Sequence, residues 1–372
     1  MKICLDGRFW GPTHTGLGIY TRELVYELAR IDSRNEYFLL LRREMMSEVN
    51  LPANFHKVEA EAVAYSLKEQ WLLPYLLYKL RPDLVHFPSI NVPLFYLGRY
   101  VVTIHDLIKH ESRGRATTTR QPLVYWLKYL VYRFLFRWVL FFSGKIIVPS
   151  ESVKAELFRR YRLNPGKIRV TYEAPVIRPE DHGDLGNLVL PDNFAIYTGN
   201  AYPHKNLENL IIAWKEVYRA SGVKLIFSSA RSVFTRRFTQ LIKEHNAGEY
   251  LLFLGYLSEA QLVAAYRRAR IYVFPSFIEG FGIPGLDAMN SGLPVVCSDI
   301  PVLREVYGEA AYYFNPGDRQ DISGKVIRVL RDVDLQKKLA ARGRERVKRY
   351  SWQKMARQTL EIYEDSVGLR SG

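Results

Sequence analysis

The sequence contains only two cysteines among its 372 residues and no long hydrophobic run that is free of charge. Cys4 and Cys297 each lie in an apolar stretch typical of a buried strand, which predicts free thiols in a reducing compartment and argues against a disulfide. The opening residues, MKICLD, lack the basic start, apolar middle and small-residue cleavage site of a signal peptide. We therefore expect a cytoplasmic protein without a secretory leader.

One apolar stretch, residues 123–142, is long enough to cross a bilayer, but it carries Lys128, Arg133 and Arg137. Charges at the centre of a span are costly, so we expect a buried or interfacial helix instead. Aromatic residues interleaved with basic ones suit a lipid headgroup region. An ordinary core helix is the alternative.

Metal ligands in clusters are also lacking. The acidic string Asp332-Val333-Asp334 has the form of a metal motif, but it lies in a charged, helix-like segment far from any glycine-rich turn. It therefore predicts a solvated helix face. We expect no metal and no bound cofactor.

Acidic residues are outnumbered, with 38 Asp and Glu against 53 Lys and Arg and a net charge of +15. Residues 99–145 are the most basic segment, with nine basic residues (Arg113, Arg115 and Arg120 among them) and two acidic ones. Such a field attracts nucleic acid, lipid headgroups or phosphorylated substrates. Because no nucleic-acid reader motif is present and the aromatic residues lie in apolar runs, we expect no nucleic acid.

Strand-like runs alternate with helix-like segments, which predicts parallel sheets covered by helices. The length suits two domains rather than one. We predict an α/β protein with Rossmann-like domains at residues 1–180 and 181–350, a Pro-, Gly- and Asp-rich linker at 173–193, and a final helix within 351–372. The expected strands are Ile3–Asp6, Tyr37–Leu41, Leu84–Phe87, Val101–Ile104, Lys145–Val148, Phe194–Thr198, Lys224–Ser228, Tyr250–Leu254, Ile271–Phe274 and Val295–Ser298.

The segment 275–288, PSFIEGFGIPGLDA, follows one of these strands with a glycine-rich turn. Pro284 marks the start of a helix, because proline suits the first helical turn. The positive end of that helix suits a phosphate. Two acids, Glu279 and Asp287, flank the turn and could hold hydroxyl groups. A sugar joined to a diphosphate would meet both needs.

This segment resembles the donor site of the retaining nucleotide-sugar glycosyltransferases of family 4, which have the GT-B fold. The resemblance implies two Rossmann-like domains that face each other across a cleft, with the acceptor in the first and the donor in the second. It also implies that the final helix, within 351–372, crosses back to the first domain. It implies that Glu279 faces the transferred sugar and that Asp287, which replaces the family's glutamate, holds the ribose, either over a longer distance or through a water molecule. The turn residues Gly280, Phe281, Gly282 and Ile283 join this donor site. The alternative is a solvated loop acid at Glu279 and a helix-dipole role for Asp287.

Other donor residues follow from the same resemblance. Lys205 is expected to bind the diphosphate, where an ammonium can neutralise the charge of the leaving group; a surface lysine is the alternative. Asn200 stands where many relatives carry an arginine. Tyr256 and Leu257 match the loop around the nucleotide base, although Ser258 and Gln261 also fit a helix capping box.

Two features of the first half complete the expected site. Gly16 alone carries over from the glycine pair that the family has in this loop, and the loop lacks the spacing of a nicotinamide-dinucleotide site. His105 follows a buried strand at the carboxyl edge, where α/β proteins bind ligands. The resemblance implies that His105 contacts the transferred sugar, so that His105, Glu279 and Lys205 are the catalytic residues. A structural histidine is the alternative.

The sequence therefore predicts a metal-independent, retaining glycosyltransferase that uses a nucleotide-diphosphate sugar. Mannose from GDP-mannose is the first candidate, because the segment from Pro294 to Pro316 looks most like the mannosyltransferase branch. The expected acceptor is a glycan or lipid-linked glycan of surface polysaccharide or lipopolysaccharide synthesis, reached from the inner face of an anionic cytoplasmic membrane. Rhamnose, glucose, N-acetylglucosamine and a non-catalytic binding subunit are the alternatives.

Overall fold

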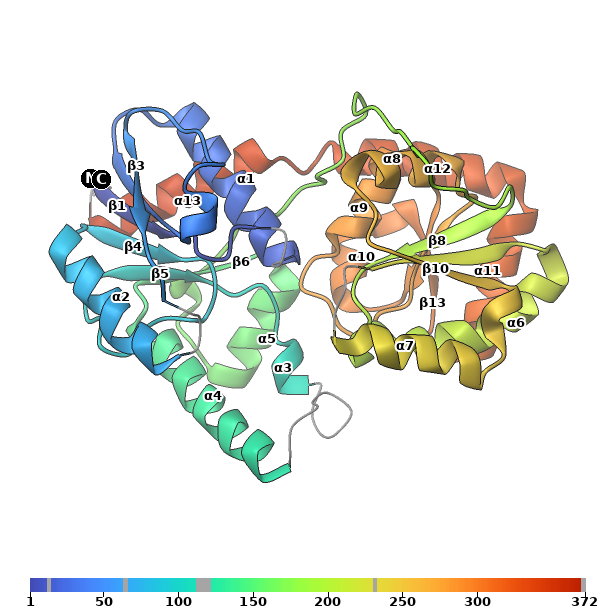
Figure 1. The fold of residues 1–372 in the computed structure, drawn as a ribbon, viewed down its shortest axis with the longest axis horizontal. Helices are drawn as coiled ribbons and strands as arrows, with labels where there is room; N and C mark the ends of the chain where they lie inside the picture. The colour runs from blue at the N-terminus through green and yellow to red at the C-terminus, as the bar shows by residue number, and fades with distance from the viewer. Residues whose placement is uncertain (12–14, 63–65, 112–121, 230–232, 369–372) are drawn as a thin grey trace. The chain divides into compact units, whose positions relative to one another are not determined.

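The computed structural model describes residues 1–11, 15–62, 66–111, 122–229 and 233–368. The chain forms two compact units (Figure 1). The first unit comprises 1–107, 118–173 and 351–372, and the second comprises 108–117 and 174–350.

The first unit contains a parallel sheet of seven strands among the described residues, in the order β3-β2-β1-β4-β5-β6-β7. These strands are β1 (Lys2–Asp6), β2 (Glu36–Leu41), β3 (Phe55–Glu59), β4 (Leu84–Phe87), β5 (Tyr100–Thr103), β6 (Lys145–Val148) and β7 (Ile168–Val170). The helical segments are α1 (Thr15–Ile31), η1 (Arg43–Met45), α2 (Leu67–Leu80), α4 (Pro122–Phe142), α5 (Glu151–Tyr161), η3 (Pro165–Lys167) and α13 (Trp352–Val367).

The second unit contains a parallel sheet of six strands among its described residues, in the order β10-β9-β8-β11-β12-β13. They are β8 (Phe194–Thr198), β9 (Lys224–Ser228), β10 (Leu251–Gly255), β11 (Tyr272–Phe274), β12 (Val295–Ser298) and β13 (Ala311–Phe314). The helical segments are α3 (Ile108–Glu111), η4 (Pro203–Lys205), α6 (Leu207–Ser221), α7 (Val233–Glu244), η5 (Ala247–Glu249), α8 (Glu259–Arg268), α9 (Ile283–Asn290), α10 (Pro301–Tyr307), η6 (Gly308–Ala310), α11 (Arg319–Arg331) and α12 (Val333–Val347).

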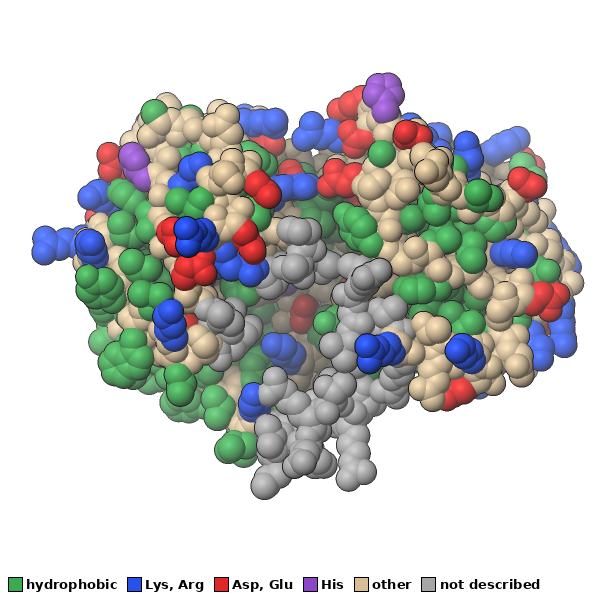
Figure 2. All heavy atoms as spheres, in the orientation of Figure 1, with side chains coloured by type: hydrophobic (Ala, Val, Ile, Leu, Met, Phe, Trp, Pro, Cys, Tyr) green, Lys and Arg blue, Asp and Glu red, His purple; other side chains and the backbone are tan. Residues whose placement is uncertain are grey.

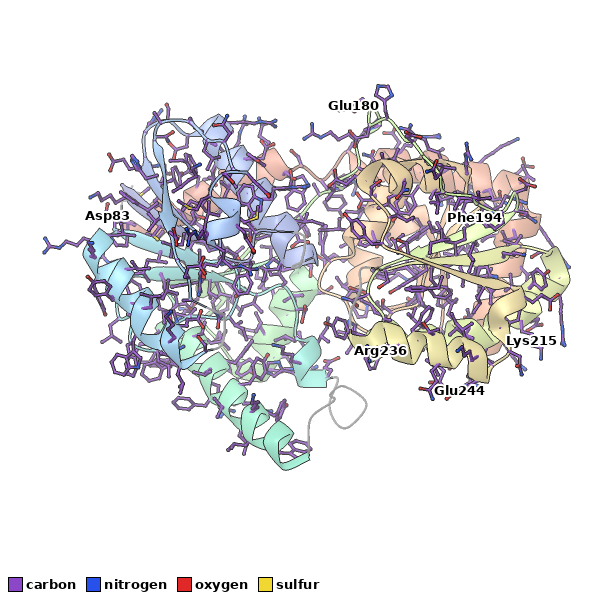
Figure 3. The ribbon with its side chains drawn as sticks, in the orientation of Figure 1. Asp83, Glu180, Phe194, Lys215, Arg236 and Glu244 are labelled. Carbon is purple, nitrogen blue, oxygen red and sulfur yellow. The ribbon has the colours of Figure 1, made fainter. Side chains whose placement is uncertain are left out.

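Both sheets have the same doubly wound order. The chain adds strands on one side of the first strand and then crosses over to add the remaining strands on its other side. This change of side lies between β1 and β4 in the first sheet and between β8 and β11 in the second. Ligands of open α/β sheets bind at the carboxyl ends of the strands at such a switch point. Asp83 and Phe194, labelled in Figure 3, mark the opposite, amino ends of β4 and β8.

The central strands are short apolar runs because helices cover both faces of each sheet. Every residue of β4, β5, β8 and β12 is buried. Cys4 and Cys297 are buried free thiols in β1 and β12, as the sequence predicts. Burial raises the pKa of both thiols well above the usual value.

The C-terminal helix α13 belongs to the first unit, where it packs against α1. Its Asp365 carboxylate accepts a salt bridge of 2.9 Å from Lys145 of β6. The Tyr363 hydroxyl lies 2.6 Å from Nδ1 of His86, at the third position of β4. The last described helix is therefore part of the same core as the first strands.

The segment that follows Glu173 lies on the second unit. The N–H of Asp184 donates to the carbonyl of Ala260 on α8, and Arg267 of α8 donates to the carbonyls of Pro179 and Asp181. These bonds fix much of the Pro- and Gly-rich linker to one helix.

The expected α/β fold with two Rossmann-like domains is confirmed, and all ten expected strands are present within one residue of their observed bounds. Three observed strands were not predicted from the sequence: β3, β7 and β13. All three lie at sheet edges.

Candidate active site

The switch point of the second sheet brings two predicted residues together. Lys205 ends η4 in the loop after β8, and Glu279 lies in the loop after β11. Because β8 and β11 are neighbours, their loops open at the same edge. The lysine Nζ lies 2.6 Å from the Glu279 Oε1, and both side chains are nearly buried, at 13% and 9% exposed. Lys205 also lies 5.5 Å from the ring centre of Phe274.

The glycine-rich turn that follows Glu279 leads into α9. Gly282 caps the helix with a φ of 101°, a conformation that favours glycine. The buried Tyr307 donates from its hydroxyl to the Gly282 carbonyl at 2.6 Å, and a Cβ on Gly282 would lie 2.5 Å from that hydroxyl. Tyr307 therefore holds the turn in place through its hydrogen bond to the backbone of Gly282. The sequence patterns did not single out this residue.

The predicted turn residues differ in what they offer a donor. The Phe281 ring is buried and packs edge-on against Tyr350, with centroids 5.5 Å apart. Its backbone is therefore the part that could face a ligand. Gly280 and Gly282 flank it, and Ile283 begins α9 with Pro284 in the first helical turn. The positive end of α9 thus lies at the turn that Glu279 begins, which is a local setting for an anion.

Asp287 binds the linker rather than solvent. Its Oδ1 accepts the backbone N–H groups of Val176 and Ile177 at 2.6 and 3.0 Å, and the residue is 7% exposed. Burial raises the pKa of Asp287 to about 7, against the lowering effect of the two N–H bonds. The ribose contact implied by the resemblance remains a prediction. The structure adds a linker-anchoring role that was not expected.

The remaining donor candidates lie in the loops after β8 and β10. The Asn200 carbonyl accepts a bond of 2.9 Å from the Tyr197 hydroxyl, and its side-chain Oδ1 is buried without a partner among the described residues. Tyr256 is exposed and Leu257 is buried. The Ser258–Gln261 capping box is confirmed, with both reciprocal hydrogen bonds present.

His105 lies just after β5 in the first unit and has acceptors at both ring nitrogens. Nδ1 lies 3.0 Å from the Glu173 Oε1, and Nε2 lies 3.0 Å from the Pro88 carbonyl. Two acceptors require two ring protons, so this setting favours the imidazolium. Burial opposes the charge, but Glu173 outweighs it and raises the pKa of His105 above the usual value. Glu173 was expected only as part of the linker.

A buried hydrogen-bonded chain supports the His105 region. The His86 ring bridges the Tyr363 hydroxyl and the Thr103 Oγ1, which also lies 3.0 Å from the Tyr20 hydroxyl. The Tyr20 ring in turn packs edge-on against His105, with centroids 4.6 Å apart. Burial, aided by the nearby His105, lowers the pKa of His86 to about 3. The two histidines therefore differ in charge.

A buried ionic cluster lies at the carboxyl end of β1. The Arg8 guanidinium contacts both oxygens of Asp6 at 2.7 Å and the Glu69 Oε1 at 2.7 Å. Burial alone would lower the pKa of Arg8, but the two carboxylates outweigh it and raise the value. Gly16 lies nearby in sequence, exposed in the first turn of α1, whereas the preceding loop residues 12–14 lie outside the described residues.

No group of three or more His, Cys, Asp or Glu side chains within the described residues is arranged to hold a metal ion. Asp332 accepts the N–H of Leu335 at 2.8 Å and caps α12. The acidic string is exposed, as predicted, but it lies at the break between α11 and α12 rather than along the face of one helix.

Comparisons with known proteins agree with these features. The family model described as Glycosyltransferase Family 4 matches residues 14–174, and the model described as Glycosyl transferases group 1 matches residues 186–346. O-antigen chain mannosyltransferase B of Escherichia coli is 34% identical, over 94% of this chain and 96% of its own. O-antigen chain mannosyltransferase RfbU of Salmonella typhimurium is 26% identical, over 83% of this chain and 86% of its own.

Solved structures show the same fold. A sucrose-phosphate synthase from Thermosynechococcus elongatus covers 100% of both chains with a TM-score of 0.80 at 19% identity. WaaG, a glycosyltransferase involved in lipopolysaccharide biosynthesis, covers 97% of this chain and 99% of its own with a TM-score of 0.73 at 13% identity. Family models, full-length relatives and fold together show that the chain is a mannosyltransferase-like member of glycosyltransferase family 4 with the GT-B fold.

Proposed function

We propose that the protein transfers a hexose with retention of configuration and without a metal, with mannose from GDP-mannose as the first candidate. The observation that carries the proposal is the Lys205–Glu279 pair at the switch point of the second sheet, beside the start of α9. A cation and a helix N-terminus would hold the diphosphate. A carboxylate beside them would hold sugar hydroxyls.

In the proposed reaction, the bond between the sugar's anomeric carbon and the phosphate oxygen breaks. The acceptor oxygen bonds to that carbon on the same face, and its proton passes to the departing phosphate oxygen. Lys205 stabilises the negative charge that develops on the diphosphate. We keep His105 as the third catalytic residue, because Glu173 and the Pro88 carbonyl favour its charged form.

The acceptor proposal rests on the relatives. Two full-length relatives are named as O-antigen chain mannosyltransferases. We propose a glycan or lipid-linked glycan of surface polysaccharide or lipopolysaccharide synthesis as the acceptor. The enzyme would then work in the cytoplasm, bound peripherally to the inner face of the membrane. No described helix of the protein has both the length and the apolarity that a membrane span requires.

A donor screen tests this function directly. The thermal stability of the protein should rise with GDP-mannose more than with nucleotide forms of rhamnose, glucose or N-acetylglucosamine. Transfer from the selected donor to a lipid-linked glycan should then give a product whose anomeric configuration, measured by NMR, matches that of the donor. Inversion would refute the retaining mechanism. Donor binding without any transfer across a panel of acceptors would favour the binding-subunit alternative.

A further inference from the structure

The first unit exposes large apolar side chains along α2. Leu67, Trp71, Tyr75 and Tyr78 follow one another at spacings of three and four residues, so they form a stripe on one side of the helix. Each is at least half exposed, from 50% for Tyr78 to 85% for Leu67. An amphipathic helix of a soluble domain normally presents polar residues to water. We therefore expect another molecule or a membrane to cover this stripe.

The loop 94–97 extends the stripe. The Phe95 ring stacks on Trp71 with centroids 4.5 Å apart, and the Tyr78 hydroxyl bonds to the Phe95 carbonyl and the Leu97 N–H. These contacts hold the loop against α2. Phe95 and Leu97 are themselves 49% and 73% exposed.

The surface continues onto α4. A cavity of about 370 Å³ is lined by Leu94, Phe95 and Leu97 of the loop and by Phe134 and Trp138 of α4. Further along α4, exposed apolar side chains include Leu127, Leu130 and Phe141. We call the exposed apolar side chains of α2, loop 94–97 and α4 the aromatic face. Figure 2 shows hydrophobic side chains gathered over this part of the first unit.

Charge distinguishes among possible partners. α4 carries Lys128, Arg133 and Arg137 and no acidic residue. The exposed charges of α2 are Lys68 and Lys79, because its single acid, Glu69, is buried against Arg8. The charged groups that rim the aromatic face on the two helices are therefore all positive.

We propose that the aromatic face docks on a membrane surface of anionic lipids. Aromatic and aliphatic side chains would enter the boundary between headgroups and acyl chains, and the rim of cations would contact the headgroups. A second copy of the chain fits less well, because it would bring two positive rims together. The inference deepens the proposed function, since it assigns the surface on which an enzyme with a lipid-linked acceptor would sit.

Vesicle flotation of the full-length protein tests the proposal without donor or acceptor, so its outcome is independent of the transfer reaction. The protein should float with phosphatidylcholine vesicles that contain phosphatidylglycerol and much less with phosphatidylcholine alone. High salt should release part of the bound protein. Equal binding to both vesicle types at low salt, or no binding to either, would overturn the proposal.

Two pairs of substitutions separate the apolar and ionic contributions. Trp71→Ser with Phe134→Ser should lower binding at all salt concentrations. Lys128→Ser with Arg137→Ser should lower it roughly tenfold or more at low salt and little at high salt. Val189→Ser with Lys338→Ser, at exposed positions of the second unit, is the matched control and should bind like wild type.

Thermal denaturation and light scattering complete the experiment. Each variant should unfold near the wild-type temperature, because the replaced side chains are largely exposed. If the apolar pair instead converted a wild-type dimer into a monomer and left vesicle binding unchanged, the face would be a protein interface. Arg113, Arg115 and Arg120 of the basic segment lie outside the described residues and have no part in these variants.

Discussion

Lys205 and Glu279 form an ion pair, with the ammonium nitrogen 2.6 Å from a carboxylate oxygen. A diphosphate that binds Lys205 must therefore compete with Glu279. Glu279→Gln should bind a free nucleoside diphosphate more tightly than wild type, by up to about tenfold or ~1.4 kcal/mol. The same variant should lose sugar transfer. Calorimetric titration with GDP and a transfer assay give the two measurements.

The lysine variant should behave differently. Lys205→Ala should weaken nucleoside-diphosphate binding and abolish transfer, whereas Lys215→Ala, at an exposed site on α6 labelled in Figure 3, should change neither.

The Glu279→Gln variant also has an outcome that would contradict the competition between its carboxylate and the diphosphate. Weaker GDP binding by Glu279→Gln than by wild type would mean that the carboxylate positions Lys205 for the phosphate rather than competing with it.

Transfer should proceed unchanged in excess chelator, because Lys205 and the start of α9 together would supply the positive charge that a metal supplies elsewhere. The assay is initial rate with EDTA and with added magnesium or manganese. Complete loss in chelator with recovery on adding either ion would refute the metal-independent mechanism.

The charge of His105 should depend on Glu173. The imidazolium–carboxylate interaction stabilises the fold below pH about 6.5 and is lost as the pH rises through the raised pKa of His105. Glu173→Gln keeps an acceptor oxygen but removes the charge, so it should lower that pKa. The fall of kcat/KM on the alkaline side should move to lower pH by the same amount. NMR titration of the ring protons reports the pKa directly, and an unchanged titration would contradict the assignment.

Asp287 should make the protein less stable as the pH rises from about 4 to about 7. Its folded-state pKa is raised to about 7, so the native state holds a proton that the unfolded state has already released. Asp287→Asn can keep the acceptor for the Val176 and Ile177 amides without the buried charge. This variant should make the free energy of unfolding depend less on pH, and above pH 7 it should raise that free energy by on the order of 1–3 kcal/mol.

A second substitution at this position tests the linker bonds. Asp287→Ala removes the acceptor and should cost about 1–3 kcal/mol in the free energy of unfolding. Asp334→Asn, at an exposed position of α12, is the control. Denaturant unfolding at several pH values gives the free energy of unfolding of each protein. If this free energy depended on pH in the same way for the wild type and for Asp287→Asn, the raised pKa assigned to Asp287 would be wrong.

The sequence predicted the central strands and the edge strand β10 but missed three other edge strands, and for β3 and β7 the reason is physical. A strand buried on both faces must be apolar throughout, as in β8 (FAIYT) or β12 (VVCS). The edge strand β3, FHKVE, needs only Phe55 fully buried and exposes His56, Lys57 and Glu59. Its pattern resembles a loop. β7 has only three residues and one of them, Arg169, is exposed.

The candidate site was predictable only where a motif carried it. Lys205 and Glu279 lie in recognisable strand–turn segments, but their ion pair joins residues 74 positions apart and follows from the order of β8 and β11. Glu173, Tyr307 and His86 carry no local signal. Each forms a hydrogen bond to a residue that is distant in the sequence and that only the folded chain places beside it.

The bond between Tyr363 and His86 should be important for stability. Tyr363→Phe leaves a buried ring nitrogen without its partner, which should cost about 1–3 kcal/mol. The pKa of His86, lowered to about 3, makes the first unit lose stability as the pH falls below about 6.5. Thermal denaturation of the variant and of wild type, with an exposed control such as Tyr256→Phe, checks the cost. Equal unfolding temperatures would show that the bond contributes little.

The place of α13 in the first unit also constrains how the protein is made. Residues 174–350 must emerge from the ribosome before the helix that packs on α1 and reaches His86 exists. At about 5–20 residues per second, the roughly 200 intervening and final residues take on the order of 10–40 seconds. Throughout that interval the nascent first unit lacks part of its core. Its folding therefore finishes after synthesis of the second unit, although its strands are translated first.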